Sequence, residues 1–165
     1  MSAKGQEKTR VFPRGVRQTI LTIHIVVSVG LLGDTAGFLA VAFRLSRTTE
    51  PRAINELVQV LNTFAMVFGI PLSFAAIVTG LILGVMSKWG VFRYPWVVAK
   101  QLLIISVMVA GGFVIGPALD TMRHGGQGAT HLMAAAAYDL AALTTATALS
   151  VFKPGRRFRS DKEHV

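Results

Sequence analysis

Long apolar runs separated by short polar segments dominate the chain. Four such runs stand out, at residues 18–43, 58–86, 96–119 and 130–152. Each run is long enough for the roughly 20 apolar residues that cross a hydrocarbon core about 30 Å thick. The runs are continuous, unlike the short alternating strands of a membrane barrel. Because backbone polar groups in lipid must be satisfied within the segment, the pattern predicts an all-α polytopic membrane protein, an antiparallel bundle of four transmembrane helices.

Composition favours the same class of protein. Of the 165 residues, 52% are hydrophobic and only 15% are charged, whereas a soluble domain carries about a quarter of charged residues. The net charge of +9 is concentrated at the two ends and in the connections, which is typical of a protein beside an anionic membrane surface. We therefore expect the lipid bilayer as a partner and no nucleic acid. The chain has no cysteine, which excludes disulfides and thiolate metal sites.

The ends of the chain are polar. Residues 1–17 and 153–165 are basic, and the glycines and prolines of the first segment predict disorder. The membrane domain is expected to cover residues 18–152. Most of the 17 Lys and Arg residues lie in the two tails and the middle connection, which share one side of a four-span protein. The positive-inside rule therefore predicts a multi-pass plasma-membrane protein with both termini in the cytosol.

Two carboxyl groups lie inside the predicted spans. At a rise of about 1.5 Å per residue, Asp34 lies about 5 Å and Asp139 about 3 Å outward of the centre of its helix. A charged group in the hydrocarbon costs about 2.5–3.5 kcal/mol, so such residues are kept inside the bundle and mark functional sites. Asp34 and Asp139 are therefore the first candidates for a site.

Each carboxyl lies on a stripe of small residues, where membrane helices approach closely. The stripes comprise Gly30, Gly33 and Gly37 in the first run and Ala135, Ala142 and Ala146 in the fourth. If they meet, Asp34 adjoins Asp139 and at least one of the two is protonated. The hydroxyl donors expected beside them are Thr35, Tyr138, Thr144 and Thr145.

Two interpretations of these carboxyls stay open. A protonatable pair in the middle of the membrane is what a proton-coupled transporter needs. Alternatively, each carboxyl is neutral or hydrogen-bonded and only locks helix packing, as polar residues between membrane helices commonly do.

Pro71 lies near the middle of the second run. It cannot donate to the carbonyl of Val67 and its ring pushes that turn open, which predicts a kink. Transporters build midplane binding sites at broken helices, so Pro71 is a candidate hinge. A proline kink is also a routine feature of membrane helices.

Two basic groups form a candidate inner polar pair. His24 lies about 10 Å and Lys100 about 11 Å inward of the span centres. The simpler interpretation is a hydrogen-bonded histidine and a lysine that reaches the interface. His24 and His131 are separated by about 25 Å along the membrane normal, too far to ligate one metal or haem iron. We expect no metal site and no cofactor.

Two stretches carry a resemblance to a known family. They are the first helix from Leu21 to Gly33, and the stretch from Pro71 to Lys100 with its Thr-Gly-Leu and Trp-Gly-x-Phe…Trp-Val…Lys pattern. Over residues 18–152 the chain resembles a family of small four-helix integral membrane proteins that is common in actinobacteria and has no assigned function. The resemblance implies a four-helix bundle in the plasma membrane and assigns no role to any residue.

Signatures of soluble enzymes are absent from the sequence: it has no phosphate loop, Gly-x-Ser-x-Gly or His-Glu-x-x-His motif. We therefore expect no catalytic activity. The sequence favours an accessory or structural membrane component, within a larger membrane complex or as a homo-oligomer. The alternative is a small proton-coupled transporter or permeation unit that uses Asp34 and Asp139. A weaker alternative is a membrane enzyme or haem protein.

Overall fold

The computed structural model describes residues 14–86 and 95–152, and every element in these ranges is helical. The elements form four rods. The first is α1 (Arg14–Ser46) and the fourth is α6 (Ala129–Phe152). The second comprises α2 (Pro51–Thr63), the π-helical segment η1 (Phe64–Gly69) and α3 (Ile70–Met86), and the third comprises α4 (Pro95–Ala110), the π-helical segment η2 (Gly111–Ile115) and α5 (Gly116–Arg123).

Each rod is long and apolar enough to cross a membrane. The candidate spans are Gly15–Ser46, Pro51–Met86, Trp96–Arg123 and Ala129–Phe152. The predicted all-α fold with four spans is therefore confirmed. The predicted tails at residues 1–13 and 153–165 lie outside the described residues, whereas residues 14–17 belong to α1.

The second rod begins earlier than the apolar run that predicted it. Its helix starts at Pro51, at a first-turn position that suits a residue without an N–H donor. In α2, Val58 and Leu61 are buried while Glu56 and Gln59 are exposed. Polar residues on one face of α2 interrupt the apolar run but do not end the helix. The start of the second span was therefore predicted at residue 58, too late in the chain.

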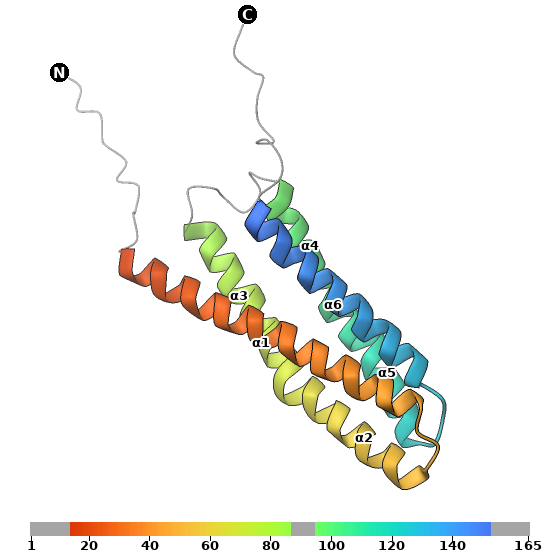
Figure 1. The fold of residues 1–165 in the computed structure, drawn as a ribbon. Helices are drawn as coiled ribbons and strands as arrows, with labels where there is room; N and C mark the ends of the chain where they lie inside the picture. Colours follow the sequence, from red (N-terminus) through yellow and green to blue (C-terminus); the bar gives the residue numbers. More distant parts are fainter. Residues whose placement is uncertain (1–13, 87–94, 153–165) are drawn as a thin grey trace, which may run out of the picture.

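The four rods run back and forth between two ends of the bundle (Figure 1). The first residues of α1 and α4 and the last residues of α3 and α6 lie at one end, which we call the terminal end. The turns at residues 47–50 and 124–128 lie at the other, which we call the loop end. Helix α1 packs against α6 and α3, and α4 packs against α6.

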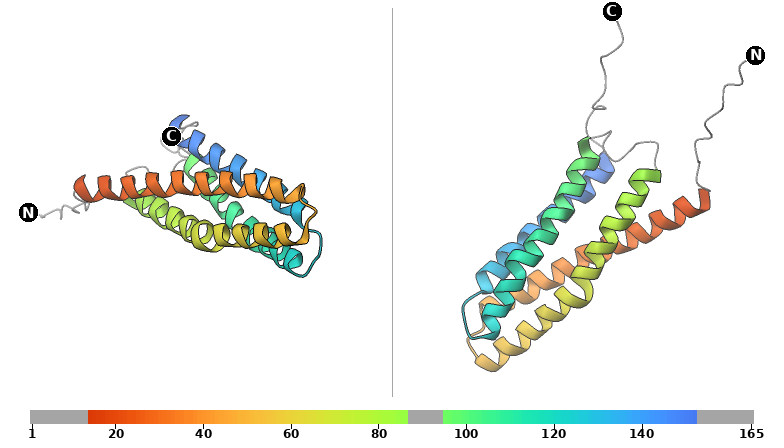
Figure 2. Two further views of the ribbon diagram at one scale, coloured as in Figure 1. Left: turned by 60° about the horizontal axis from the view of Figure 1, so that its bottom comes forward. Right: turned by 180° about the vertical axis from the view of Figure 1, so that it is seen from behind.

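Helix α1 crosses the bundle at an angle, so its first half diverges from α6 (Figure 2). Val26 and Val29 in this half are each 65% exposed. The opposite half of α1 is packed, with Leu31, Phe38, Ala42 and Leu45 buried. The bundle is therefore tight at the loop end and more open at the terminal end.

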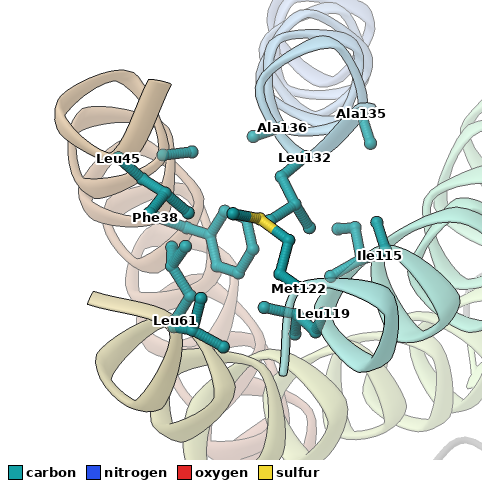
Figure 3. Close-up of a cluster of buried hydrophobic side chains, with 12 residues drawn as sticks. Phe38, Leu45, Leu61, Ile115, Leu119, Met122, Leu132, Ala135 and Ala136 are labelled. Carbon is teal, nitrogen blue, oxygen red and sulfur yellow. The ribbon is translucent and has the colours of Figure 1, made fainter. Parts of the chain in front are cut away.

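Two clusters of buried side chains fill the bundle. The loop-end cluster includes Phe38, Leu45, Leu61, Ile115, Leu119, Met122, Leu132, Ala135 and Ala136 (Figure 3). The central cluster consists of Leu31, Ala76, Val107, Ala142 and Leu143. Both clusters take side chains from all four rods, so each ties the bundle together by close packing, which is what holds helices together in lipid.

Candidate functional site

A polar layer lies between the two apolar clusters. On α1, Thr35 lies midway between Leu31 of the central cluster and Phe38 of the loop-end cluster. On α6, Asp139 lies between Ala142 of the central cluster and Ala136 of the loop-end cluster. Asp139 is 5% exposed and Thr35 is 8% exposed. A buried carboxyl and a buried hydroxyl therefore share one level of the bundle.

Asp34 reaches this level from another face of α1. Its Oδ2 atom lies 3.4 Å from the point where a Cβ on Gly69 would stand. Asp34 therefore faces the end of η1 in the second rod, and the absence of a side chain on Gly69 makes room for it. Neighbouring helical residues point about 100° apart, since about 3.6 residues make a turn, which is why Asp34 and Thr35 face different neighbours.

The small-residue stripe of α1 has a different partner from the expected one. A Cβ on Gly30 would lie 3.6 Å from Leu72, and one on Gly37 would lie 3.0 Å from the ring of Phe64. The glycines thus face the second rod, and a Cβ on Gly33 would meet nothing within 4 Å. Gly30 and Gly37 therefore do not meet the alanine stripe of α6, which was the condition for placing Asp34 beside Asp139. Small size permits close approach but does not specify which helix approaches.

The two carboxyls share one chemical feature. Oδ1 of Asp34 and Oδ1 of Asp139 are buried and have no hydrogen-bond partner in the part of the chain that the structure describes. A buried polar atom without a partner costs about 1–3 kcal/mol. These oxygens can accept a hydrogen bond or a cation, and a carboxyl in such a place can exchange a proton.

The hydroxyl groups expected beside the carboxyls are engaged elsewhere. Thr35 Oγ1 donates to the carbonyl of Leu31 at 2.9 Å, and Thr144 Oγ1 donates to the carbonyl of Leu140 at 2.7 Å. Thr145 is likewise bonded to the carbonyl of residue 141. Bonds of this kind to the preceding turn are common for threonine within helices. Of these hydroxyl groups, only Thr35 is buried at the level of Asp139.

Tyr138, another expected donor, faces the third rod. Its hydroxyl donates to Ser106 Oγ at 2.7 Å, and the residue is 48% exposed. The tyrosine proton is therefore bound to a serine of α4 rather than to Asp139.

Both π-helical segments lie beside the polar layer. The segment η1 ends at Gly69, which contacts Asp34. The segment η2 follows Val107 of the central cluster and ends at Ile115 of the loop-end cluster. Each ends two residues before a proline, Pro71 or Pro117. Proline leaves the carbonyl of the preceding turn without a donor, and a wider π turn accommodates that change. The second rod visibly bends there (Figure 1).

The break at Pro71 was predicted from the sequence, whereas the two π segments and the role of Pro117 were not. The signal was present, because Gly-Ile-Pro at residues 69–71 and Ile-Gly-Pro at residues 115–117 repeat the same combination of a glycine and a proline. Single-turn π bulges are frequent at functional sites. Their position in two rods at the level of the carboxyls strengthens the polar layer as the candidate site.

The inner polar pair lies toward the terminal end. His24 Nδ1 is 2.8 Å from Thr79 Oγ1 of α3. Lys100 on α4 is half-buried, and its neighbour Gln101 lies with His24 against Gly80 of α3. Three helices therefore bring polar groups together at this second place.

The remaining histidines lie at the loop end. His124 and His131 line an open groove of about 810 Å³ between the two turns. His124 is bonded to its own helix, with Nδ1 2.9 Å from the carbonyl of Asp120. Within residues 14–86 and 95–152, no three His, Cys, Asp or Glu side chains are placed to hold a metal ion.

Comparison with known proteins gives a family. A search of curated proteins found no match, and a search of solved structures found none either. A family model with the description "Predicted integral membrane protein (DUF2269)" matches residues 18–152, which include all of the polar layer and the inner polar pair. Because this match covers most of the chain, the protein belongs to that family of integral membrane proteins of unknown function.

Proposed function

We propose that the protein is a small proton-coupled transport or permeation unit in which Asp34 and Asp139 carry the proton. The observation that supports this most directly is the burial of Oδ1 of both carboxyls without a hydrogen-bond partner among the described residues. Acidic residues within membrane spans are rare, and in pumps and transporters they form proton relays. A carboxyl that only locked two helices together would be expected to hold a donor on its partner helix.

The neighbouring backbone supports a moving part. Gly69, the last residue of η1, lies against Asp34, and Pro71 follows it. Transporters place midplane sites next to interrupted helices, where a change in one turn alters access. In the proposed mechanism Pro71 is the hinge, and a change at η1 opens the surroundings of Asp34 to one side or the other.

The proposal includes the membrane, the orientation and the oligomeric state of this unit. Basic residues are concentrated in the two tails, which supports a plasma-membrane protein with both termini in the cytosol. Four helices enclose little space for a solute path, so the transport unit is proposed to be a homo-oligomer.

An accessory role in a larger membrane complex is the second candidate. It is favoured by the first half of α1, which diverges from α6 and leaves Val26 and Val29 each 65% exposed. A partner helix could pack there. Purification in mild detergent separates the candidates, because an accessory protein should bring a larger partner along, whereas a transport unit should purify as copies of this chain.

Proton flux into liposomes tests the main proposal. The protein and its Asp34→Asn and Asp139→Asn variants are reconstituted at equal density, and acidification is followed with a pH-sensitive dye. Asp120→Asn is the matched control, because the Asp120 side chain is 70% exposed at the loop end. We expect the two buried variants to lose most of the flux and the control to keep it. Equal flux from all four proteins would remove the carboxyls from any coupling role.

A further inference from the structure

We propose that the inner polar pair is part of a site for the phosphate of an anionic phospholipid headgroup. The site is formed by His24 of α1, Lys100 and Gln101 of α4, and Gly80 of α3. It is separate from the carboxyl layer and does not depend on proton transport.

The hydrogen bonds of Thr79 determine which nitrogen of His24 is free. Thr79 has one hydroxyl proton, and it donates to the carbonyl of Ala75 at 2.6 Å. Thr79 Oγ1 must therefore accept from His24, so the histidine carries its proton on Nδ1, 2.8 Å away. A neutral histidine then presents an unprotonated Nε2, and a protonated one presents Nε2–H as a donor.

Gly80 allows α3 to lie close to the side chains of His24 and Gln101. A Cβ on Gly80 would lie 3.2 Å from His24 Cε1 and 3.7 Å from Gln101 Nε2. The imidazole of α1 and the amide of α4 therefore lie against the same point on α3. A Cβ at position 80 would therefore be tight against His24 and in ordinary contact with Gln101.

Lys100 supplies a charge that no carboxylate of the described residues pairs with. It is half-buried, and no carboxylate lies within salt-bridge distance of it in residues 14–86 and 95–152. The polar layer is further along the bundle, since on α1 Asp34 lies ten residues beyond His24, or about 15 Å at about 1.5 Å per residue. A lysine near the end of a membrane helix needs an anion or the headgroup region to offset its burial.

The depth of the group selects the ligand. Lys100 lies one turn after Trp96, where the third span begins, so its long side chain brings the ammonium within reach of the headgroups. Arg17 is exposed on the face of α1 that carries His24, two turns closer to the terminal end. Basic pockets between membrane helices bind the phosphates of anionic lipids. Lys100 would contribute the charge, Gln101 Nε2 would donate to a phosphate oxygen, and His24 would donate through Nε2–H in its protonated form, which a bound phosphate favours.

Fluorescence quenching by brominated lipid tests the site. In a Trp89→Phe background Trp96 is the remaining tryptophan, one turn from Lys100. Quenching of Trp96 is measured in two lipid mixtures, one of brominated phosphatidylglycerol with plain phosphatidylcholine and one of plain phosphatidylglycerol with brominated phosphatidylcholine. Comparing the two gives the preference of the site for the anionic lipid. We expect Lys100→Gln to lower that preference about fivefold, the loss expected for one basic residue beside anionic lipid. Lys100→Arg should keep it, and Arg44→Gln, which removes an exposed cation at the loop end, should leave it unchanged.

Two further measurements distinguish a lipid phosphate from free phosphate and show whether a variant has merely misfolded. Inorganic phosphate at millimolar concentration should leave the preference intact; if it removes the preference, the ligand is free phosphate and the lipid assignment is overturned. Phosphatidylglycerol retained by the intact protein after detergent exchange is also counted by mass spectrometry, with Gln101→Leu as a variant that keeps every charge. Equal retention and equal quenching in the wild type, Lys100→Gln and Gln101→Leu proteins would overturn the proposal.

Discussion

Tyr138 on α6 donates a hydrogen bond to Ser106 on α4, with 2.7 Å between the two oxygens. Ser106 in turn donates to the carbonyl of Leu103 at 2.7 Å, so the bond ends on the backbone of α4. The next residue on α6, Asp139, points about 100° away and is buried. The hydrogen bond of Tyr138 is therefore made on one face of α6 while the carboxyl of Asp139 lies on another, inside the bundle.

Removing the Tyr138 hydroxyl should weaken the bundle slightly. Hydrogen bonds between membrane helices contribute about 0.6 kcal/mol on average and at most about 1.7 kcal/mol, so Tyr138→Phe should lower the free energy of unfolding by that amount. Ser106→Ala should cost about as much. Unfolding in mixed detergent micelles measures both, and the double variant should cost no more than either single one. Fully additive losses would show that the two hydroxyls do not interact.

The approach of α1 to the second rod depends on Gly37. A Cβ there would lie 3.0 Å from Cε1 of Phe64, whereas one on Gly33 would meet nothing within 4 Å. Gly37→Leu should therefore cost about 1–3 kcal/mol, as overpacking does elsewhere. Gly33→Leu, on the same helix, should change the free energy of unfolding by less than about 0.5 kcal/mol. Equal losses would place the two glycines in similar surroundings and contradict the packing of α1.

The carboxyl of Asp139 should be unfavourable for folding. Its Oδ1 is buried without a hydrogen-bond partner among the described residues, so Asp139→Ala should raise the free energy of unfolding by about 1 kcal/mol. The same variant should lose proton flux, since a site kept for function commonly costs stability. Asp120→Ala, at an exposed position, is the control. A clear loss of stability in Asp139→Ala would instead favour a purely structural role.

Pro71 should maintain the bend in the second rod. Pro71→Ala restores a donor for the carbonyl of the preceding turn, which should straighten the rod and move its ends apart. The chain has no cysteine, so spin labels on Arg52→Cys and Val85→Cys report this distance without further changes. Pro51→Ala, at the start of α2, should leave the distance unchanged. An unaltered distance in Pro71→Ala would show that packing, rather than the proline, bends the rod.

The sidedness of the protein can be tested by labelling. Single cysteines at Thr49 and Gln127 lie in the two turns of the loop end, and a membrane-impermeant maleimide should label them in intact cells. A cysteine at Gly15, at the start of α1, should be labelled only after the membrane is permeabilised. The reverse pattern would place the termini outside.

Much of the architecture could be predicted from sequence. The number of spans follows from continuous apolar runs, because a backbone in lipid has to form its own hydrogen bonds. The similar depth predicted for Asp34 and Asp139 came from counting residues, since each helical residue advances the chain by about 1.5 Å. The start of the second rod could not be predicted, because Glu56 and Gln59 on the exposed face of α2 interrupt the apolar run.

Only the tertiary structure decided which faces of the helices meet. Gly30 and Gly37 face the second rod, Asp34 faces Gly69, and Tyr138 is bonded to Ser106. In water the polar face of a helix marks its outside, whereas in lipid the inside and outside of a bundle are both apolar. The sequence of this protein therefore determines how far along each helix a side chain lies, while the direction in which it points is determined by the close packing of four particular helices.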